Sequence, residues 1–300
     1  MKYNWSIIGH EKQLEGLEND LASGNLAHAY LMTGPNSVGK FTVAKKLAGI
    51  LQCEGDFCHN CNVCMQVEKG CHIDTVEMAD NGESIKIDEM RKLIDRLSMT
   101  RQSKYKVVLI QSIERMGNEA ANSFLKMLEE PPERTIFIMT TDKLKNLLPT
   151  IISRVRVVKF GSVSQDYIRN SLKNLFPELE AKTVEEVASL CMGKTGKAMQ
   201  LASEPEVLAG YIKTYRDILN FLDNRNLADK FKYLDELLAD EKQIEVFLDI
   251  LVNVLRTRML DGQSEDNRYL NLLSKVEETY ILLGKNINSR LALENLMLEL

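Results

Sequence analysis

Four of the six cysteines in this 300-residue chain lie within residues 53–64, which read CEGDFCHNCNVC. Thiolates are soft ligands that suit a tetrahedral Zn²⁺ ion, and a C-x-x-C spacing lets two thiolates reach one ion from a tight turn. The pattern predicts a zinc site formed by Cys53, Cys58, Cys61 and Cys64. Four protein ligands leave no open coordination position, so the predicted site is structural.

Two alternatives remain for this cluster, namely an iron–sulfur centre and four reduced thiols without a metal. A short exposed loop with little core is hard to stabilise unless a metal holds it. Cys71, His59 and His72 are reserve ligands. Cys191 lies in an apolar helical stretch and is predicted to belong to the core.

A second candidate site is the stretch GPNSVGKFT, in which Gly34, Gly39 and Lys40 fit the pattern G-x-x-x-x-G-K. In a working loop of this kind the backbone cradles phosphate, and a hydroxyl after the Lys binds Mg²⁺. Here Phe41 follows the Lys, and Thr42 lies about 100° further around the new helix. We predict a degenerate loop of Gly34, Gly39, Lys40 and Thr42, in which binding of ATP or ADP is doubtful.

The strand end that would supply the acidic residues of a nucleotide site is also altered. Residues 106–112 read KVVLIQS, a buried strand that ends in Gln111 and Ser112. An Asp at this strand end would hold Mg²⁺ and a following Glu would polarise water. Glu114 is near in sequence, but we expect it to point elsewhere. The chain alone is therefore not expected to hydrolyse ATP, and the loop could be a helix-capping turn that no longer needs a ligand.

Apolar runs that alternate with helical patterns surround these candidate sites. The expected strands are 27–34, 75–80, 106–112, 135–141 and 155–160, and the expected helices between them include 39–51, 87–99 and 119–132. The runs at 106–112, 135–141 and 155–160 are predicted to be buried on both faces of a parallel sheet. Strands alternating with helices indicate a layered α/β domain.

Helical periodicity dominates after residue 160, including two predicted helices around Gly193–Gly196. The chain is therefore predicted to have three parts. Residues 1–160 form an α/β domain with a metal module at about 53–71, residues 161–205 form a small helical domain, and residues 206–300 form an all-α domain.

Composition narrows the class of protein. The net charge of −5 gives no strong general attraction to nucleic acid. Local basic clusters at Arg101, Lys104 and Lys106, and at Lys143 and Lys145, could contact phosphate, although solvated surface charge is the favoured interpretation. The N-terminus lacks a signal-peptide pattern and no apolar run approaches membrane-spanning length, so we expect a cytoplasmic protein without a membrane partner.

Several longer stretches resemble one known family. These are HAYLMTGP at 28–35, AANSFLKMLEEPPERTIFIMTT at 120–141, LPTIISRV at 148–155 and NINSRLALENLMLEL at 286–300. They look like segments of the clamp-loader subunits of bacterial DNA polymerase III, an AAA+ family that includes gamma/tau and delta-prime. The cysteine cluster is similar to the zinc module of that family, although its first spacing is shorter than expected.

The resemblance implies an AAA+ domain of the P-loop NTPase type at 1–160, a helical lid domain at 161–205 and a helical collar at 206–300. In this family gamma/tau is the ATP-hydrolysing motor, whereas delta-prime is generally a stator with degraded motifs. By the match at Gly193, the sensor arginine of the motor falls at Gly196. The altered loop therefore favours the non-hydrolysing delta-prime type.

The resemblance also assigns a role to Arg154. The family motif S-R-C supplies an arginine finger to ATP on the adjacent subunit, and here it reads Ser153-Arg154-Val155. A guanidinium near the γ-phosphate stabilises charge that builds up in the transition state. Arg156 is the second candidate for this role.

Three functional hypotheses follow. The first is a stator that is no enzyme on its own and that acts with gamma/tau and delta in a hetero-pentamer, reaching the sliding clamp and primed DNA through that complex. The second is a short gamma/tau-like ATPase in which Thr42 and Glu114 rescue the missing groups. The third is a zinc-stabilised DNA-binding module.

Overall fold

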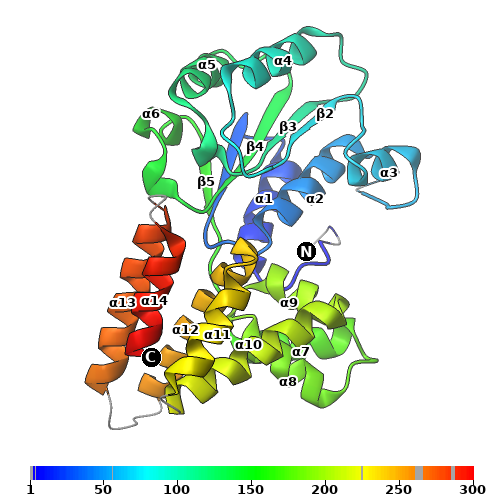
Figure 1. Ribbon diagram of the computed structural model, residues 1–300. Helices are drawn as coiled ribbons and strands as arrows, with labels where there is room; N and C mark the ends of the chain where they lie inside the picture. Colours follow the sequence, from blue (N-terminus) through cyan, green and yellow to red (C-terminus); the bar gives the residue numbers. More distant parts are fainter. Residues whose placement is uncertain (1–2, 4, 56, 224–225, 261–265, 285–287) are drawn as a thin grey trace. The chain divides into compact units, whose positions relative to one another are not determined.

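Five short strands form one parallel sheet in the computed structural model (Figure 1), which describes residues 3, 5–55, 57–223, 226–260, 266–284 and 288–300. The strands are β1 (Ala29–Thr33), β2 (Thr75–Met78), β3 (Lys106–Ile110), β4 (Thr135–Thr141) and β5 (Arg156–Lys159). Their order is β2-β3-β4-β1-β5. The predicted parallel sheet is therefore confirmed, with β1 between β4 and β5.

Burial along the strands follows their place in the sheet. Every residue of β1, β3 and β4 is buried, as their continuous apolar runs predict. The prediction that the run at 155–160 is buried on both faces is wrong. β5 is an edge strand whose end residues Arg156 and Lys159 are exposed. Its apolar pattern does not reveal that one of its sides has no neighbouring strand.

Helices cover both faces of this sheet, with α1 and α2 on one side of the strands and α4 and α5 on the other (Figure 1). Tyr30 and Met32 of β1 belong to the core cluster that contains the apolar faces of α1 (Glu11–Ser23), α2 (Lys40–Gln52) and α3 (Asn62–Glu68). Ala29 and Leu31 point the other way because successive strand side chains alternate. They pack in the cluster of α4 (Ile87–Ser98), α5 (Asn118–Glu129) and α6 (Pro149–Ile152).

Two short 3₁₀ turns follow the strands, η1 (Ile113–Arg115) after β3 and η2 (Leu144–Asn146) after β4. The remaining chain is helical. It comprises α7 (Gln165–Leu175), α8 (Ala181–Leu190), α9 (Thr195–Ser203), α10 (Pro205–Asp223), α11 (Leu227–Leu237), α12 (Glu241–Leu260), α13 (Asp266–Gly284) and α14 (Ser289–Glu299). No helix within the described residues is long and apolar enough to cross a membrane.

The chain forms two compact units. The first contains residues 1–171 and 193–197, and the second contains residues 172–192 and 198–300. The finer division at 160 and 205 stays a prediction. In the second unit α12 packs against α10 and α13, and α14 packs against α11 and α13. Asn288 caps α14 by accepting from the backbone N–H groups of Arg290 and Leu291, while Asn286 and Ile287 of the family-like ending lie outside the described residues.

Lys106 is a structural residue of the first unit. Its side chain is buried, and its ammonium donates to the carbonyl oxygens of Leu97 (2.6 Å) and Met99 at the end of α4. A cation at this place satisfies carbonyl groups that the helix leaves unpaired and interacts favourably with the negative helix end. The suggestion that Lys106 contacts DNA phosphate is therefore wrong, and only Arg101 and Lys104 of that cluster remain accessible.

We expect Lys106→Met to destabilise the first unit by roughly 2 kcal/mol, because buried carbonyl groups lose their donor. Lys104→Met is the matched control, since Lys104 is exposed on the loop just before β3. The control should change the free energy of unfolding by less than about 0.5 kcal/mol. Urea unfolding followed by circular dichroism measures both values, and equal stabilities for the two variants would contradict the capping role.

Candidate phosphate pocket and metal centre

The loop between β1 and α2 begins at a very close backbone approach. Gly34 has φ 151°, and a Cβ atom at this position would collide with the carbonyl group of Phe160, which follows β5. The Gly34 N–H donates to the carbonyl of Thr141 at 3.3 Å, and the Phe160 N–H donates to Thr33 at 2.7 Å. Glycine is therefore required where the chain leaves the sheet between β4 and β5.

A cavity of about 630 Å³ lies beside this loop at the carboxyl ends of the strands. Gly39, Lys40 and Thr42 line it, as expected, whereas Gly34 lies at the base of the loop and contributes a carbonyl group. The opposite wall consists of polar residues that follow β2 and β3 or that lie at and after the end of β4. They are Asp80, Gln111, Ser112, Glu114, Arg115, Thr140, Thr141, Asp142 and Lys143.

Lys40 is present in this cavity but is bound to its own loop. Its Nζ donates to the carbonyl oxygens of Gly34 (2.7 Å) and Pro35 (2.6 Å), and the residue is only 8% exposed. Burial lowers the pKa of the Lys40 ammonium, while the nearby carboxylates of Asp142 and Glu114 act in the opposite direction. The loop therefore supplies two hydrogen-bond acceptors to its own lysine without phosphate.

Phe41 occupies the position after the lysine and lines the cavity with its neighbour Thr42. The phenyl ring lies under the ammonium of Lys45, which is 5.2 Å from the ring centroid. A phenyl group offers no oxygen ligand to Mg²⁺, which binds oxygen almost exclusively in proteins. The neighbouring Thr42 lines the same cavity, so its hydroxyl is the group available in place of the missing hydroxyl at position 41.

Gln111 braces the opposite wall. Its side-chain oxygen accepts from the backbone N–H of Asp80 at 3.2 Å, and its backbone N–H donates to the Met78 carbonyl. Ser112 then has φ 52°, in the left-handed region, and the chain turns into η1. An amide therefore takes a structural position at the strand end where a working site would place a carboxylate.

The expectation that Glu114 points elsewhere is wrong. The turn at Ser112 and the short η1 helix bring the Glu114 carboxyl group to the cavity wall beside Asp142. Burial, together with the adjacent Asp142, raises the pKa of Glu114, and the hydrogen bond from Glu114 lowers the pKa of Asp142. The sequence pattern of β3 gave no sign of this turn, because its backbone conformation depends on a single positive φ angle.

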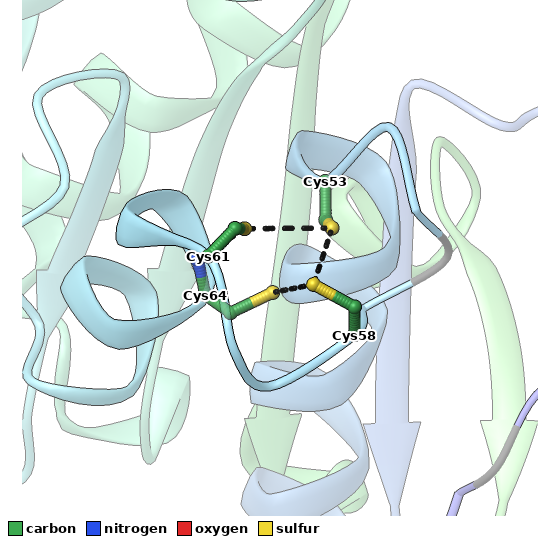
Figure 2. A group of neighbouring side chains, drawn as sticks. All are labelled: Cys53, Cys58, Cys61 and Cys64. Atoms are coloured by element: carbon green, nitrogen blue, oxygen red, sulfur yellow. Dashed lines mark hydrogen bonds between the residues drawn. The ribbon is translucent and has the colours of Figure 1, made fainter.

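The four cysteines converge as predicted (Figure 2). Cys53 caps the end of α2 and Cys61 caps the start of α3, so the loop between these helices carries the cluster. The Sγ atom of Cys53 lies 3.9 Å from that of Cys58 and 3.8 Å from that of Cys61. All four sulfur atoms lie within 4.8 Å of one another.

These separations fit four thiolates around one ion. A tetrahedral Zn²⁺ site with bonds of about 2.3 Å places its sulfur atoms about 3.8 Å apart. A disulfide would instead need a separation of about 2.05 Å. Backbone N–H groups of Asn60 and Cys61 lower the pKa of the Cys58 thiol to about 6, which favours its thiolate form, whereas burial raises the pKa of the Cys64 thiol.

The reserve ligands do not join the cluster within the described residues. His59 pairs with Glu68 at 2.6 Å, and the buried His72 bonds to Thr75 at 3.0 Å. Cys71 is exposed and outside the group of four. Cys191 is fully buried in the second unit, which confirms its place in the core.

Comparison with known proteins identifies the family. Residues 9–164 match the family model described as DNA polymerase III, delta subunit. The chain belongs to this family. It is similar to DNA polymerase III subunit gamma of Buchnera aphidicola subsp. Acyrthosiphon pisum (strain APS), with 30% identity over 236 residues, covering 75% of this chain and 65% of that protein.

A second relative of this clamp-loader family is DNA polymerase III subunit delta′ of Bacillus subtilis (strain 168). It is 35% identical over 160 residues, covering 52% of this chain and 49% of that protein. The chain thus spans less than two thirds of the length of these curated relatives. The crystal structure of a DNA polymerase III gamma subunit-related protein from Thermotoga maritima gives a TM-score of 0.56 at 22% identity, covering 94% of this chain and 97% of that chain. This likeness shows that the two chains share a fold.

The family-like residue Arg154 follows α6 and is not among the residues that line the chain's own cavity. Its guanidinium bonds to the Glu129 carboxylate at 2.7 Å and donates to the Thr150 carbonyl at 3.0 Å. Arg156 has a different environment. It pairs with Asp20, which is 7% exposed, and its guanidinium carbon lies 6.0 Å from the ring centroid of Tyr30. Arg156 is thus an internal tie between β5 and α1.

Gly196, at the position of the family's sensor arginine, lies directly against the phosphate loop. A Cβ atom there would meet the Ser37 carbonyl oxygen at 2.7 Å, so this arrangement leaves no room for a side chain. The preceding Thr195 donates its hydroxyl to the Val38 carbonyl at 2.9 Å, and the His10 ring donates to the same oxygen at 3.1 Å. Backbone and side-chain contacts from outside the loop therefore hold its conformation.

Proposed function

We propose that this chain is a non-hydrolysing, delta-prime-type subunit of a DNA polymerase III clamp loader. It acts as a stator beside gamma/tau and delta subunits in a hetero-pentamer, which places the sliding clamp on primed DNA during replication. Membership of the clamp-loader family supports the general role. The observation that carries the non-hydrolysing assignment is that Phe41 and Gln111 line the cavity where Mg²⁺ would need oxygen ligands.

In this proposal the catalytic contribution is made in trans. Arg154 extends toward ATP on a neighbouring subunit and stabilises the negative charge that develops on the transferred phosphoryl group. Its position outside the chain's own cavity, on a partly exposed guanidinium, is compatible with such a role. The internal contacts of Arg156 with Asp20 and Tyr30 argue against that second candidate.

The competing motor hypothesis gains one observation, because Glu114 and Thr42 both line the cavity. A base and a hydroxyl are thus available, but neither replaces the two missing metal ligands. The DNA-binding module loses one of its basic residues, since Lys106 is buried against α4. The stator hypothesis requires neither replacement metal ligands nor additional basic residues for DNA.

The isolated chain should show no Mg²⁺-dependent ATP turnover. Without groups that hold the metal, several kcal/mol of transition-state stabilisation are missing. Release of labelled phosphate by the metal-replete protein measures this. Lys40→Ala is the control for contaminating ATPase, because genuine turnover would disappear in that variant. Turnover that depends on Lys40 would replace the stator with the motor hypothesis.

Arg154→Ala should lower ATP turnover of the reconstituted clamp loader, since one transition-state cation is lost. Removal of an arginine finger lowers the rate at its own site by roughly 10³-fold, and sites without this neighbour should keep their activity. Gel filtration should show normal assembly. Arg156→Ala is the matched control. It should lower the thermal stability of the chain and leave turnover per assembled complex unchanged, and the reverse pattern would assign the finger to Arg156.

The same proposal includes a structural zinc ion at Cys53, Cys58, Cys61 and Cys64. The thiolate donors and their mutual spacing support zinc, because the soft ligands and near-tetrahedral separations match its preferences. The bound ion would hold the loop between α2 and α3, which has little core of its own. The site would stabilise the fold and supply no catalytic step.

Purified untagged protein should contain about one zinc per chain by atomic emission analysis. Cys61→Ser should lose the metal and lower the melting temperature, because a three-thiolate site binds zinc more weakly. Cys71→Ser should keep both the metal and the stability of the parent protein. Iron in place of zinc would contradict the assignment, as would a stable metal-free protein.

A further inference from the structure

One carboxylate oxygen of Glu114 lies in an energetically unfavourable environment. The Oε2 atom is buried and has no hydrogen-bond partner among the described residues, although the residue lines the cavity beside the phosphate loop. Asp142 and Thr141 interact with this carboxyl group, but a buried oxygen without a hydrogen-bond partner is costly, so such an atom is expected to have a functional reason. The left-handed turn at Ser112 and the helix η1 fix the carboxyl group there.

The charges around Glu114 do not neutralise it fully. Lys40 on α2 faces it, but the Lys40 ammonium already donates to two carbonyl oxygens of its own loop. Arg115 pairs with Asp80 at 3.1 Å. Asp142 lies beside Glu114 and adds a second carboxylate at the exposed rim of the cavity, next to Lys143.

A nucleotide phosphate would bring further negative charge into this cavity. In working phosphate loops Mg²⁺ screens such charge from nearby carboxylates, but Phe41 stands at the position of the metal-binding hydroxyl. Like charges a few ångströms apart in a partly buried site repel strongly. Phosphate and Glu114 therefore compete for the ammonium of Lys40, which lines the cavity and which Glu114 already influences.

We infer that Glu114 is a specificity-determining residue that excludes phosphate anions from this cavity. It acts as an internal anion opposite Lys40 and keeps the pocket free of nucleoside di- and triphosphates. The inference rests on the proposed non-hydrolysing function and gives a physical reason why the retained loop stays without nucleotide. It assigns Glu114 the opposite role from a general base, which would have to assist nucleotide chemistry.

The test is binding of fluorescently labelled ADP to the full chain without Mg²⁺ at pH 8, with inorganic pyrophosphate as competitor. Glu114→Gln keeps the shape of the side chain and removes its charge, and it should tighten binding by roughly tenfold. Glu119→Gln is the matched control. Glu119 is an exposed acid in the first turn of α5 that does not line the cavity, so the same change in net charge should leave affinity unchanged.

Asp142→Asn keeps the inference testable if Glu114→Gln is poorly folded, and a double variant tests the role of Lys40 if it folds well. Asp142→Asn should shift the affinity in the same direction by a smaller factor, because this carboxylate lies at the exposed rim. In the Glu114→Gln background, Lys40→Ala should abolish the gain. Equal or weaker ADP binding by the folded Glu114→Gln and Asp142→Asn proteins would overturn the inference.

Failure of the inference is distinguishable from failure of the proposed function. Unchanged affinity in a chain that does not turn over ATP would overturn only the anion-excluding role. Mg²⁺-dependent turnover by the parent chain that disappears in Glu114→Gln would identify Glu114 as a base and overturn both. Tighter binding by Glu114→Gln, without turnover, supports the inference.

Discussion

The close passage of Gly34 against the carbonyl group of Phe160 is the constraint on which the geometry of the phosphate loop depends. β1 lies between β4 and β5, and the chain must leave it through the narrow space between their ends. Only a residue without Cβ can do so here, and the bond from Gly34 to Thr141 then fixes the exit direction. The phosphate loop, the start of α2 and the position of Lys40 all follow from this single backbone geometry.

The loop that results is stable without a ligand because its polar groups have partners within the protein. Lys40 donates to Gly34 and Pro35, and Val38 accepts from Thr195 and His10. Gln111 similarly ties the end of β3 to Asp80. The lysine, the loop and the end of β3 thus keep hydrogen-bond partners without a metal or nucleotide, and, among the described residues, the unsatisfied buried oxygen of this cavity belongs to Glu114, at a cost of about 1–3 kcal/mol for such a group.

The sequence alone predicted what depends on local pattern. Continuous apolar runs identified the strands of the parallel sheet, and the cysteine spacing identified the four thiols that meet around one point. It did not predict what depends on contacts between distant segments. Arg156 pairs with Asp20, which is 136 residues away, and Lys106 is turned inward by the end of α4. Glu114 was misplaced because one left-handed residue, Ser112, redirects the chain after β3.

The two arginines after α6 differ in the burial of their carboxylate partners, because Glu129 is exposed and Asp20 is buried. The pair between Arg154 and Glu129 is partly exposed on both sides, and such pairs contribute at most about 1 kcal/mol. Under the proposed function, Arg154 can therefore exchange Glu129 for a phosphate on a neighbouring subunit at little cost. Arg156 would have to abandon a buried carboxylate, Asp20, which also accepts from the Tyr30 hydroxyl at 3.0 Å. Removing one partner from a buried pair leaves an uncompensated charge. Under the proposed function, this difference in what each guanidinium must give up favours Arg154 over Arg156 as the residue that acts on another chain.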